Sequence, residues 1–338
     1  MKAVIPAAGQ GTRLFPQTHT KPKPMVRVAG KPILGHILDD VVDSPIEEAV
    51  VVVGVMRETV IDYVTDQYGD RLSVEFVGQE TAEGLGHAIY QARSAVDGDA
   101  MTIMLGDMLF EKGYSQFVAA HEDNGSVDGS IGVKPVDAPS NYGVVYLDDD
   151  GRIDRLVEKP ADPESNLAIS GIYIVEQSEQ LFEALEYLIE NDVRGAGEEF
   201  QLTDALQRVV EAGAAFGVVE VEAWYDCGRP ETLLEANRVL LEAQSTDGDA
   251  TPRPADSSVI VPPVDIGDGV TLTHSIVGPY VSIDDDATVE DCHVSNAILG
   301  QGAHLRRVNL ENSLIGDRAT VTGAPHELNV GDSSEIQL

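Results

Sequence analysis

A glycine-rich turn near the start of the sequence could bind a phosphate group. Residues 8–13 (AGQGTR) follow an apolar run at Lys2–Ala7, and small residues let backbone N–H groups approach an anion closely. Three of the seven lysines, Lys21, Lys23 and Lys31, follow soon after. Cations beside a backbone anion nest suit a polyphosphate.

Two familiar phosphate-binding motifs do not fit this turn. The dinucleotide fingerprint needs a third glycine where Leu14 stands, and the P-loop needs a Gly-Lys-Ser/Thr sequence that is absent. A Gly-x-Gly sequence alone is also typical of a plain tight turn. The cations that follow the turn therefore favour a phosphate site of another kind.

The elements that would position this turn alternate between strand and helix. Apolar strands are expected at Lys2–Ala7, Glu48–Val53, Val74–Val77 and Ala100–Leu105, and helices at Ile33–Val42, at a segment ending at Tyr68 and at Gly86–Val96. This alternation predicts an α/β fold with a doubly wound, mixed Rossmann-like sheet. Ligands of such sheets collect at the carboxyl ends of the strands, here at residues 8–11 and at Gly106-Asp107.

The middle of the chain carries strands and turns from 130 to 173, and then further helices and one strand. Helices are expected at Ser178–Asn191, Gln201–Ala212 and Thr232–Ala243, and a strand at Ala215–Val221. Residues 244–256 are polar and rich in turn formers, which indicates a linker. We therefore expect a catalytic domain over residues 1–243.

A six-residue period follows the linker. Val277, Ile283 and Val289 are spaced by six, and four short glycine-containing or proline-containing motifs recur. A branched apolar residue followed by a small one at this period is typical of stacked triangular coils of parallel strands. The stretch 257–330 resembles the left-handed β-helix of hexapeptide-repeat proteins, with about four coils, and 331–338 is expected to be a polar tail.

The motifs together resemble the sugar-1-phosphate nucleotidylyltransferases, above all the long glucose-1-phosphate thymidylyltransferases with a β-helical tail. The resemblance begins with GxGTRLxPxTxxxPKPMxxVxGKPIL over residues 9–34 and continues to about Leu241. Its later motifs are Gln79, GLGHA (84–88), Gly106-Asp107, YGV (142–144), EKP (158–160), SGIY (170–173), EFQLTD (199–204) and WYDCG (224–228). Such enzymes couple a nucleoside triphosphate to a sugar 1-phosphate and release pyrophosphate.

The resemblance implies a role for each matched residue. The attacking phosphate oxygen is already anionic, so the protein must align two anions and neutralise the leaving pyrophosphate, without a general base. The nucleotide would be bound by the backbone of residues 8–11, by Arg13 on the outer phosphates, by Lys23 at the α-phosphate, and by two residues at the base. The expected nucleotide-binding residues are Ala8, Gly9, Gly11, Thr12, Arg13, Gln79 and Gly84.

The sugar phosphate and the metal have matched residues too. Lys159 would hold the phosphate of the sugar and Glu158 its hydroxyls, while Gly143 and Gly171 would let the backbone approach the sugar. Asp107 and Asp226 match the metal ligands, and Mg²⁺ accepts a few carboxylates completed by phosphate oxygens. The expected catalytic residues are Arg13, Lys23, Asp107 and Asp226.

Some positions depart from the family pattern or allow a plainer interpretation. His87 stands where the thymidylyltransferases usually have Gln, and we assign it a structural role. Cys227 stands where they often have Thr, and we expect it to be buried. Trp224 is expected to pack below Asp226. Lys21 lies close enough to Lys23 to compete for its role, but the Pro-Lys-Pro frame favours Lys23.

Composition excludes several classes of function. The 58 acidic and 22 basic residues give a formal charge of −36, which argues against nucleic-acid and membrane partners. The 31 aspartates and the scarcity of lysine are typical of proteins from salt-loving organisms. No apolar run approaches ~18 residues and residues 1–6 resemble a strand rather than a signal peptide, so we expect a soluble, cytoplasmic enzyme.

Rival interpretations remain beside the preferred one, which is transfer from dTTP or UTP to glucose 1-phosphate. UTP-dependent uridylyl transfer and another sugar 1-phosphate are alternatives, because a methyl contact discriminates by only ~1–3 kcal/mol. Acyl transfer on the β-helix would use His274, His293 or His304 as a base. A non-catalytic relative is a third hypothesis. We expect a homo-oligomer in which the β-helix packs subunits together.

Overall fold

The computed structural model describes residues 1–9, 11–110, 114–125, 127–246 and 257–324. It divides into two compact units, Met1–Ala236 and Asn237–Leu338. The expected polar tail 331–338, the end of the expected β-helix and most of the expected linker lie outside the described residues. Within the described ranges, no helix is both long enough and apolar enough to cross a bilayer.

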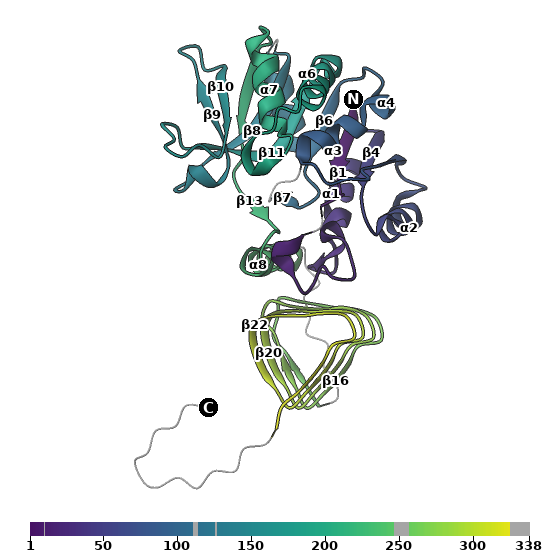
Figure 1. Ribbon diagram of the computed structural model, residues 1–338. Helices are drawn as coiled ribbons and strands as arrows, with labels where there is room; N and C mark the ends of the chain where they lie inside the picture. Colours follow the sequence, from purple (N-terminus) through teal and green to yellow (C-terminus); the bar gives the residue numbers. More distant parts are fainter. Residues whose placement is uncertain (10, 111–113, 126, 247–256, 325–338) are drawn as a thin grey trace. The chain divides into compact units, whose positions relative to one another are not determined.

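The first unit is built on a mixed nine-stranded sheet (Figure 1). Its main order is β10-β9-β11-β6-β1-β4-β5, and β8 and β12 are joined through β11. The strands are β1 (Lys2–Pro6), β4 (Glu48–Val53), β5 (Ser73–Gly78), β6 (Met101–Met104), β8 (Gly129–Pro135), β9 (Gly143–Leu147), β10 (Ile153–Glu158), β11 (Leu167–Val175) and β12 (Phe216–Glu220). The strands β6, β1, β4 and β5 run parallel, whereas β11 is antiparallel to β6. The expected mixed Rossmann-like sheet is confirmed.

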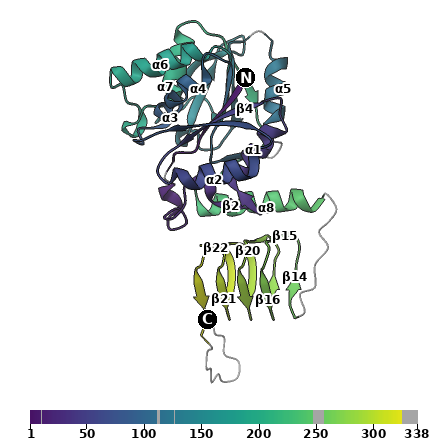
Figure 2. The ribbon, with the colours of Figure 1, turned by 90° about the vertical axis from the view of Figure 1, so that its right-hand side faces the viewer.

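Helices cover both faces of this sheet, with α3, α6 and α7 on one side and α5 on the other (Figure 2). The helices of this unit are α1 (Ile33–Val42), α2 (Arg57–Tyr68), α3 (Leu85–Gln91), α4 (Arg93–Val96), α5 (Ser115–Asp123), α6 (Ser178–Glu190) and α7 (Leu202–Glu211). A further helix, α8 (Pro230–Thr246), begins in this unit and ends in the second. The expected helix 86–96 is divided at Ala92, whose N–H bonds to the carbonyl of Ile89, three residues back. Because helices cover both faces of the sheet, residues 49–53 of the β-branched strand β4 are buried.

Small elements complete the first unit. They are the 3₁₀ helices η1 (Thr12–Leu14), η2 (Lys23–Met25), η3 (Pro139–Asn141) and η4 (Ala196–Glu198), and the strands β2 (Arg27–Val28), β3 (Lys31–Pro32), β7 (Met108–Phe110) and β13 (Trp224–Asp226). The pair β7 and β13 forms a separate antiparallel sheet. That pairing joins two segments more than a hundred residues apart in sequence, and it carries one end of the site.

The second unit contains a stack of short parallel strands with a triangular outline (Figure 1). The strands are β14 (Val259–Ile260), β15 (Val264–Ile266), β16 (Thr271–Thr273), β17 (Ile276–Val277), β18 (Val281–Ile283), β19 (Thr288–Glu290), β20 (His293–Leu299), β21 (His304–Arg306), β22 (Asn309–Ile315) and β23 (Thr320–Thr322). Val277, Ile283 and Val289, the residues at the six-residue period, are buried in its core. A β-helix-like region is therefore confirmed.

One half-buried carboxyl group of helix α1 gives a pH-dependent contribution to stability. Burial, together with Asp39 and Asp43, raises the pKa of Asp40 from 3.8 to about 7. Between these values the unfolded chain has lost the proton while the folded chain keeps it, so folding is disfavoured as the pH rises from 4 to 7. We expect Asp40→Asn to raise the Tm at pH 8 by about 2–4 °C and to leave it unchanged at pH 4. Asp62→Asn, on the exposed surface of α2, is the control, and equal Tm changes at both pH values would contradict the assignment.

Candidate active site

The glycine-rich turn lies directly after the central strand β1, and its described residues line a cavity of about 480 Å³. Gly11 has φ 63° and directly precedes η1. A Cβ added to it would come within 2.8 Å of the Lys23 Cβ. The hydroxyl of Thr18 donates to the carbonyl of Gly11 at 2.7 Å. The turn therefore needs glycine at this position, and residue 10 lies outside the described residues.

The structure brings the expected nucleotide-binding residues to this first cavity. Its lining includes Ala8, Gly9, Gly11, Thr12, Arg13, Lys23, Gln79, Gly84 and Asp107. Gln79 directly follows β5, and Gly84 precedes α3 with φ 111°. A Cβ at Gly84 would collide with the backbone of Phe200, so this glycine is required by packing as well as by its conformation.

A second cavity of about 360 Å³ adjoins the first. The expected sugar-phosphate residues Gly143, Glu158, Lys159 and Gly171 all line it, and so does Asp226. Arg13, Lys23, Leu85 and Asp107 line both cavities. Two anionic ligands, one in each cavity, would thus meet beside the same two cations.

Lys23 lies on the wall that the two cavities share, which is formed by the residues that line both of them. Its ammonium nitrogen lies 2.6 Å from Oδ2 of Asp107 and 3.6 Å from Oδ1 of Asp226. The lysine side chain is 11% exposed, against 35% and 27% for the two aspartates. A largely buried ammonium group therefore faces the two cavities together with two half-exposed carboxylates.

The small sheet β7–β13 brings the two aspartates together. Asp107 follows β6 through a turn, and Asp226 ends β13 opposite Met108. The N–H of Cys227 donates to the carbonyl of Asp107 at 3.0 Å, which fixes the two segments to one another. A Cβ on Gly228 would come within 2.6 Å of Oδ1 of Asp226 and 3.0 Å of the Lys23 ammonium, so a larger residue here would displace these two charged groups.

The pair Asp107 and Asp226 fits a divalent cation such as Mg²⁺. The donors are hard carboxylate oxygens, and the Lys23 ammonium lying between them shows that the pair holds positive charge. Within the described part of the chain, no cluster of three or more His, Cys, Asp or Glu side chains could hold a metal. Two carboxylates completed by ligand phosphates match the preference of Mg²⁺.

The second cavity has a polar end formed by Glu158. The hydroxyl of Thr203 donates to Oε2 of Glu158 at 2.7 Å, and the Lys159 ammonium lies 3.2 Å from Oε1. The carboxylate is 14% exposed and Lys159 is 47% exposed. A Cβ at Gly143 would lie 3.0 Å from Oε2 of Glu158, so the glycine leaves room for the carboxylate itself.

Other residues singled out in the sequence lie in different settings. Gly171 has φ 89° within β11, and a Cβ there would strike Leu105. Cys227 is fully buried, as expected, and burial raises the pKa of its thiol, so it is no ready nucleophile. Trp224 stacks near Tyr142, with ring centroids 5.6 Å apart.

The three β-helix histidines are exposed and stand on separate segments. His274 precedes β17 and pairs with Asp291 at 3.7 Å, while His293 begins β20 and His304 begins β21. Residues without a role predicted from the sequence also line the two cavities, among them Thr203, Gly228 and Arg229. The first two lie in the motifs EFQLTD and WYDCG, which was the available signal. Arg229 follows the second motif directly.

Comparison with known proteins places this site in context. A family model described as nucleotidyl transferase matches residues 2–243. The chain is 33% identical over 366 residues to the low-salt glycan biosynthesis nucleotidyltransferase Agl11 of Haloferax volcanii, with both chains fully covered. It is 33% identical over 364 residues to a glucose-1-phosphate thymidylyltransferase of Streptomyces griseus, covering all of this chain and 99% of that protein.

Two further proteins with other names are also similar to this chain. The bifunctional protein GlmU of Methanococcus vannielii is 34% identical over 354 residues, covering 98% of this chain and 77% of that protein. Among solved structures, a UDP-glucose pyrophosphorylase complexed with UDP-glucose matches with a TM-score of 0.62 at 25% identity. That match covers 73% of this chain and 98% of the other.

Proposed function

The chain belongs to the nucleotidyl transferase family, and we propose that it transfers a nucleoside monophosphate from dTTP or UTP to glucose 1-phosphate. It is a sugar-1-phosphate nucleotidyltransferase. The observation that carries the proposal is the pair of adjoining cavities that share Arg13, Lys23 and Asp107. A triphosphate in the first cavity and a sugar phosphate in the second would meet at that wall.

The chemistry needs alignment and charge neutralisation more than proton transfer. An oxygen of the sugar phosphate is already anionic, so it can attack the α-phosphorus in line while pyrophosphate leaves from the opposite side. Lys23 would stabilise the charge at the α-phosphate, and Arg13 the charge that develops on the pyrophosphate. The backbone amides after β1 would bind the triphosphate, and Lys159 would hold the phosphate of the sugar.

Two of the carboxylates would bind the metal ion, and the third would bind the sugar. Asp107 and Asp226 would hold a magnesium ion, which when bound neutralises phosphate oxygens and orients them. Glu158, held by Thr203 and Lys159, would accept hydrogen bonds from the sugar hydroxyls. Gln79 and Gly84 would contact the base at the far end of the first cavity.

The choice of glucose and of a thymine or uracil base follows the relatives. The Streptomyces griseus protein is named for glucose 1-phosphate and thymidylyl transfer, and the matched crystal structure holds UDP-glucose. The two nucleotides differ by a methyl group on the base and by the 2′-hydroxyl of the ribose. Because a methyl contact discriminates only weakly, we propose that both can be used.

A screen for pyrophosphate release tests the proposal. Five nucleoside triphosphates are assayed against six sugar 1-phosphates with magnesium and high potassium chloride, since the −36 charge suits high salt. We expect the fastest release with dTTP or UTP and glucose 1-phosphate. Fastest release with another pair would overturn the substrate assignment, and no release with any pair would refute the activity.

A variant of Glu158 tests the role of the second cavity. We expect Glu158→Gln to raise the KM for the sugar phosphate about tenfold, because an amide NH₂ replaces one acceptor oxygen. The KM for the nucleotide should stay unchanged. Steady-state kinetics with each substrate varied in turn provide the measurement, and Glu164→Gln, on an exposed side chain, is the control. An equal rise in both KM values would argue against a sugar contact.

The β-helix is proposed to pack subunits together in a homo-oligomer. Its stacked parallel strands present extended faces, which can pair across a symmetry axis. Acyl transfer is the alternative for this unit, prompted by its exposed histidines and by a relative named bifunctional. Incubation with acetyl-CoA and amino-sugar phosphates separates the two, because free thiol would be released only by an acyltransferase.

A further inference from the structure

We propose that His87 is a positioning residue that fixes the side-chain amide of Gln79 with its carbonyl oxygen available to the nucleotide cavity. The site would then select a base that carries a ring N–H between two carbonyl groups, as thymine and uracil do. This inference rests on the proposed function and deepens it. His87 itself would touch neither substrate.

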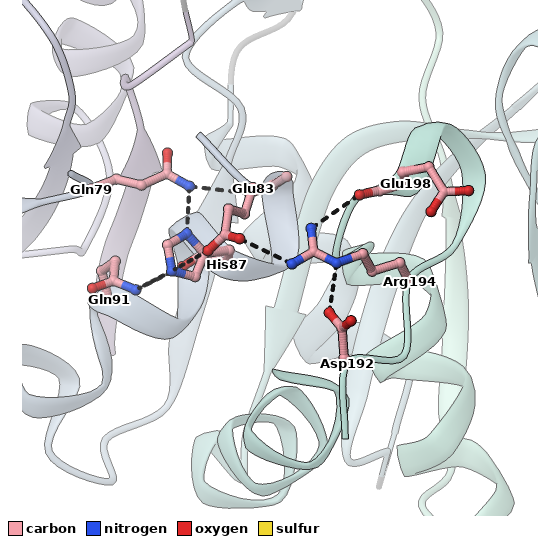
Figure 3. Close-up of polar contacts among 8 residues, drawn as sticks. Gln79, Glu83, His87, Gln91, Asp192, Arg194 and Glu198 are labelled. Carbon is pink, nitrogen blue, oxygen red and sulfur yellow. Dashed lines mark hydrogen bonds and ion pairs between the residues drawn. The ribbon is translucent and has the colours of Figure 1, made fainter. Parts of the chain in front are cut away.

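Gln79 uses both of its amide hydrogens within the protein. Its Nε2 lies 3.3 Å from the carbonyl oxygen of Gly84 and 3.0 Å from Nδ1 of His87. The carbonyl of Gly84 is purely an acceptor, so the NH₂ end of the amide must face it. The amide oxygen then points away from His87, as Figure 3 shows.

The oxygen of Gln79 is left as an acceptor at the cavity. Gln79 is 7% exposed and lines the first cavity. Within the described residues, the hydrogen bonds of its side chain are the two made by Nε2. An acceptor that faces a cavity favours a ligand that brings a donor to it.

The contact with His87 depends on which ring nitrogen carries the proton. A neutral imidazole has one donor and one acceptor nitrogen, yet amide groups face both: Gln79 at Nδ1 and Gln91 at Nε2, at 3.0 and 3.1 Å. The carboxylate of Glu83 lies 3.7 Å from Nε2 and favours the proton there. Nδ1 is then the acceptor for Gln79, and the NH₂ group of Gln91 donates to the backbone carbonyl of His87 at 3.2 Å rather than to the ring.

Glu83 is itself held in place from the other side. The Arg194 guanidinium lies 3.0 Å from Oε1 of Glu83 and 2.7 Å from Asp192, and it donates to the carbonyl of Glu198 at 3.1 Å. Figure 3 shows these groups as one chain of contacts that ends at Gln79. The orientation of the Gln79 amide is therefore supported over several residues rather than by one bond.

The fixed oxygen distinguishes bases by the polarity of one ring nitrogen. In uracil and thymine, N3 carries a hydrogen that an oxygen acceptor can receive. In cytosine, N3 is an acceptor, so two acceptors would face each other and lose a hydrogen bond in a buried place. Such a mismatch discriminates far more strongly than an extra methyl group does.

Three variants test the positioning role, with kcat and KM measured for UTP and CTP at saturating glucose 1-phosphate and for glucose 1-phosphate at saturating UTP. His87→Leu removes the acceptor for Gln79, whereas His87→Asn keeps an oxygen acceptor near the place of Nδ1. Gln91→Ala removes the other amide on the same ring and is the matched control. Binding of UTP and CTP alone, measured by calorimetry, gives a readout that needs no turnover.

We expect the wild-type protein to favour UTP over CTP at least ~100-fold in kcat/KM. His87→Leu should narrow that ratio about tenfold, through KM rather than kcat and without changing the KM for the sugar phosphate. His87→Asn should restore most of the ratio, and Gln91→Ala should keep it. An unchanged ratio in His87→Leu, or the same loss in His87→Asn, would overturn the proposal.

The remaining outcomes are also decisive. If His87→Leu fails to fold, as judged by its Tm, Glu83→Gln takes its place, because it removes the carboxylate that sets the tautomer while keeping the shape. A smaller UTP-to-CTP ratio of kcat/KM in Glu83→Gln than in the wild-type protein supports the proposal, and an unchanged ratio refutes it. If the wild-type protein binds UTP but releases no pyrophosphate, the proposed function fails while the binding ratios still test His87.

Discussion

Replacing Lys23 with methionine should lower kcat by about 10²–10³-fold, the usual size of a lost electrostatic contact in a transition state. Methionine keeps the aliphatic stem that packs against Gly11 and removes only the charge. The ammonium group lies within 3.6 Å of both Asp107 and Asp226, on the wall shared by the two cavities. It is therefore placed where the charge of two phosphorylated reactants would accumulate.

Two further lysine variants make this prediction specific. Lys21→Met changes the neighbouring lysine, which lines neither cavity, and should leave kcat near the wild-type value. Lys23→Arg keeps a positive charge but spreads it over a planar fork, so a partial recovery is expected. Measured turnover with saturating substrates, together with Tm, provides the comparison. Equal turnover for the wild-type protein and Lys23→Met would remove this lysine from the chemistry.

Asp226→Asn should raise the magnesium concentration needed for half-maximal rate by about 10–100-fold. The amide lacks the charge that attracts the ion, and Asp107 alone would have to hold it. Asp226 is held by the pairing of β13 with β7, so the substitution should change the charge more than the geometry.

The measurement is a magnesium titration of initial rate for the wild-type protein, Asp226→Asn and Asp107→Asn. Asp149→Asn, in an exposed turn, is the control in a chain with 31 aspartates. If Asp226→Asn titrates with magnesium like the wild-type protein, Asp226 is no ligand of the ion.

Much of the α/β sheet was predictable because its signals are local. The continuous β-branched run at β4 and the amphipathic pattern of α1 gave the observed bounds, Glu48–Val53 and Ile33–Val42. The six-residue period likewise predicted the parallel coils that pair Val264 with Val281 and Val281 with Ala297. In each case the repeat of apolar residues is itself the pattern of burial.

Elements that depend on distant partners were missed. The strands β7 and β13 have three residues each, which is too short for a periodic signal, and they pair across a long stretch of sequence. The break at Ala92 reflects a local tightening of the helix, which propensity does not reveal. The short helix α5 was not expected either.

The site likewise has features that the sequence predicted and features that depend on distant contacts. Motifs indicated which residue types would be present, and the expected nucleotide-binding, sugar-phosphate-binding, catalytic and metal-binding residues all line one or other cavity. The contacts of Lys23 with both Asp107 and Asp226 depend on the pairing of β7 with β13, which the sequence did not reveal. The contacts of His87 with Gln79 were equally out of reach, because a histidine at this position looked merely structural. Both are properties of tertiary packing rather than of spacing.

The central claim is a direct transfer between two reactants that occupy adjoining cavities at once. Exchange of labelled pyrophosphate into dTTP or UTP tests it most directly, since exchange requires that the bond to the α-phosphorus be broken and re-formed. We expect exchange when nucleotide-sugar is present and none when the protein is given the nucleoside triphosphate and labelled pyrophosphate alone. Exchange without any sugar compound would reveal a nucleotidyl-enzyme intermediate and contradict direct transfer.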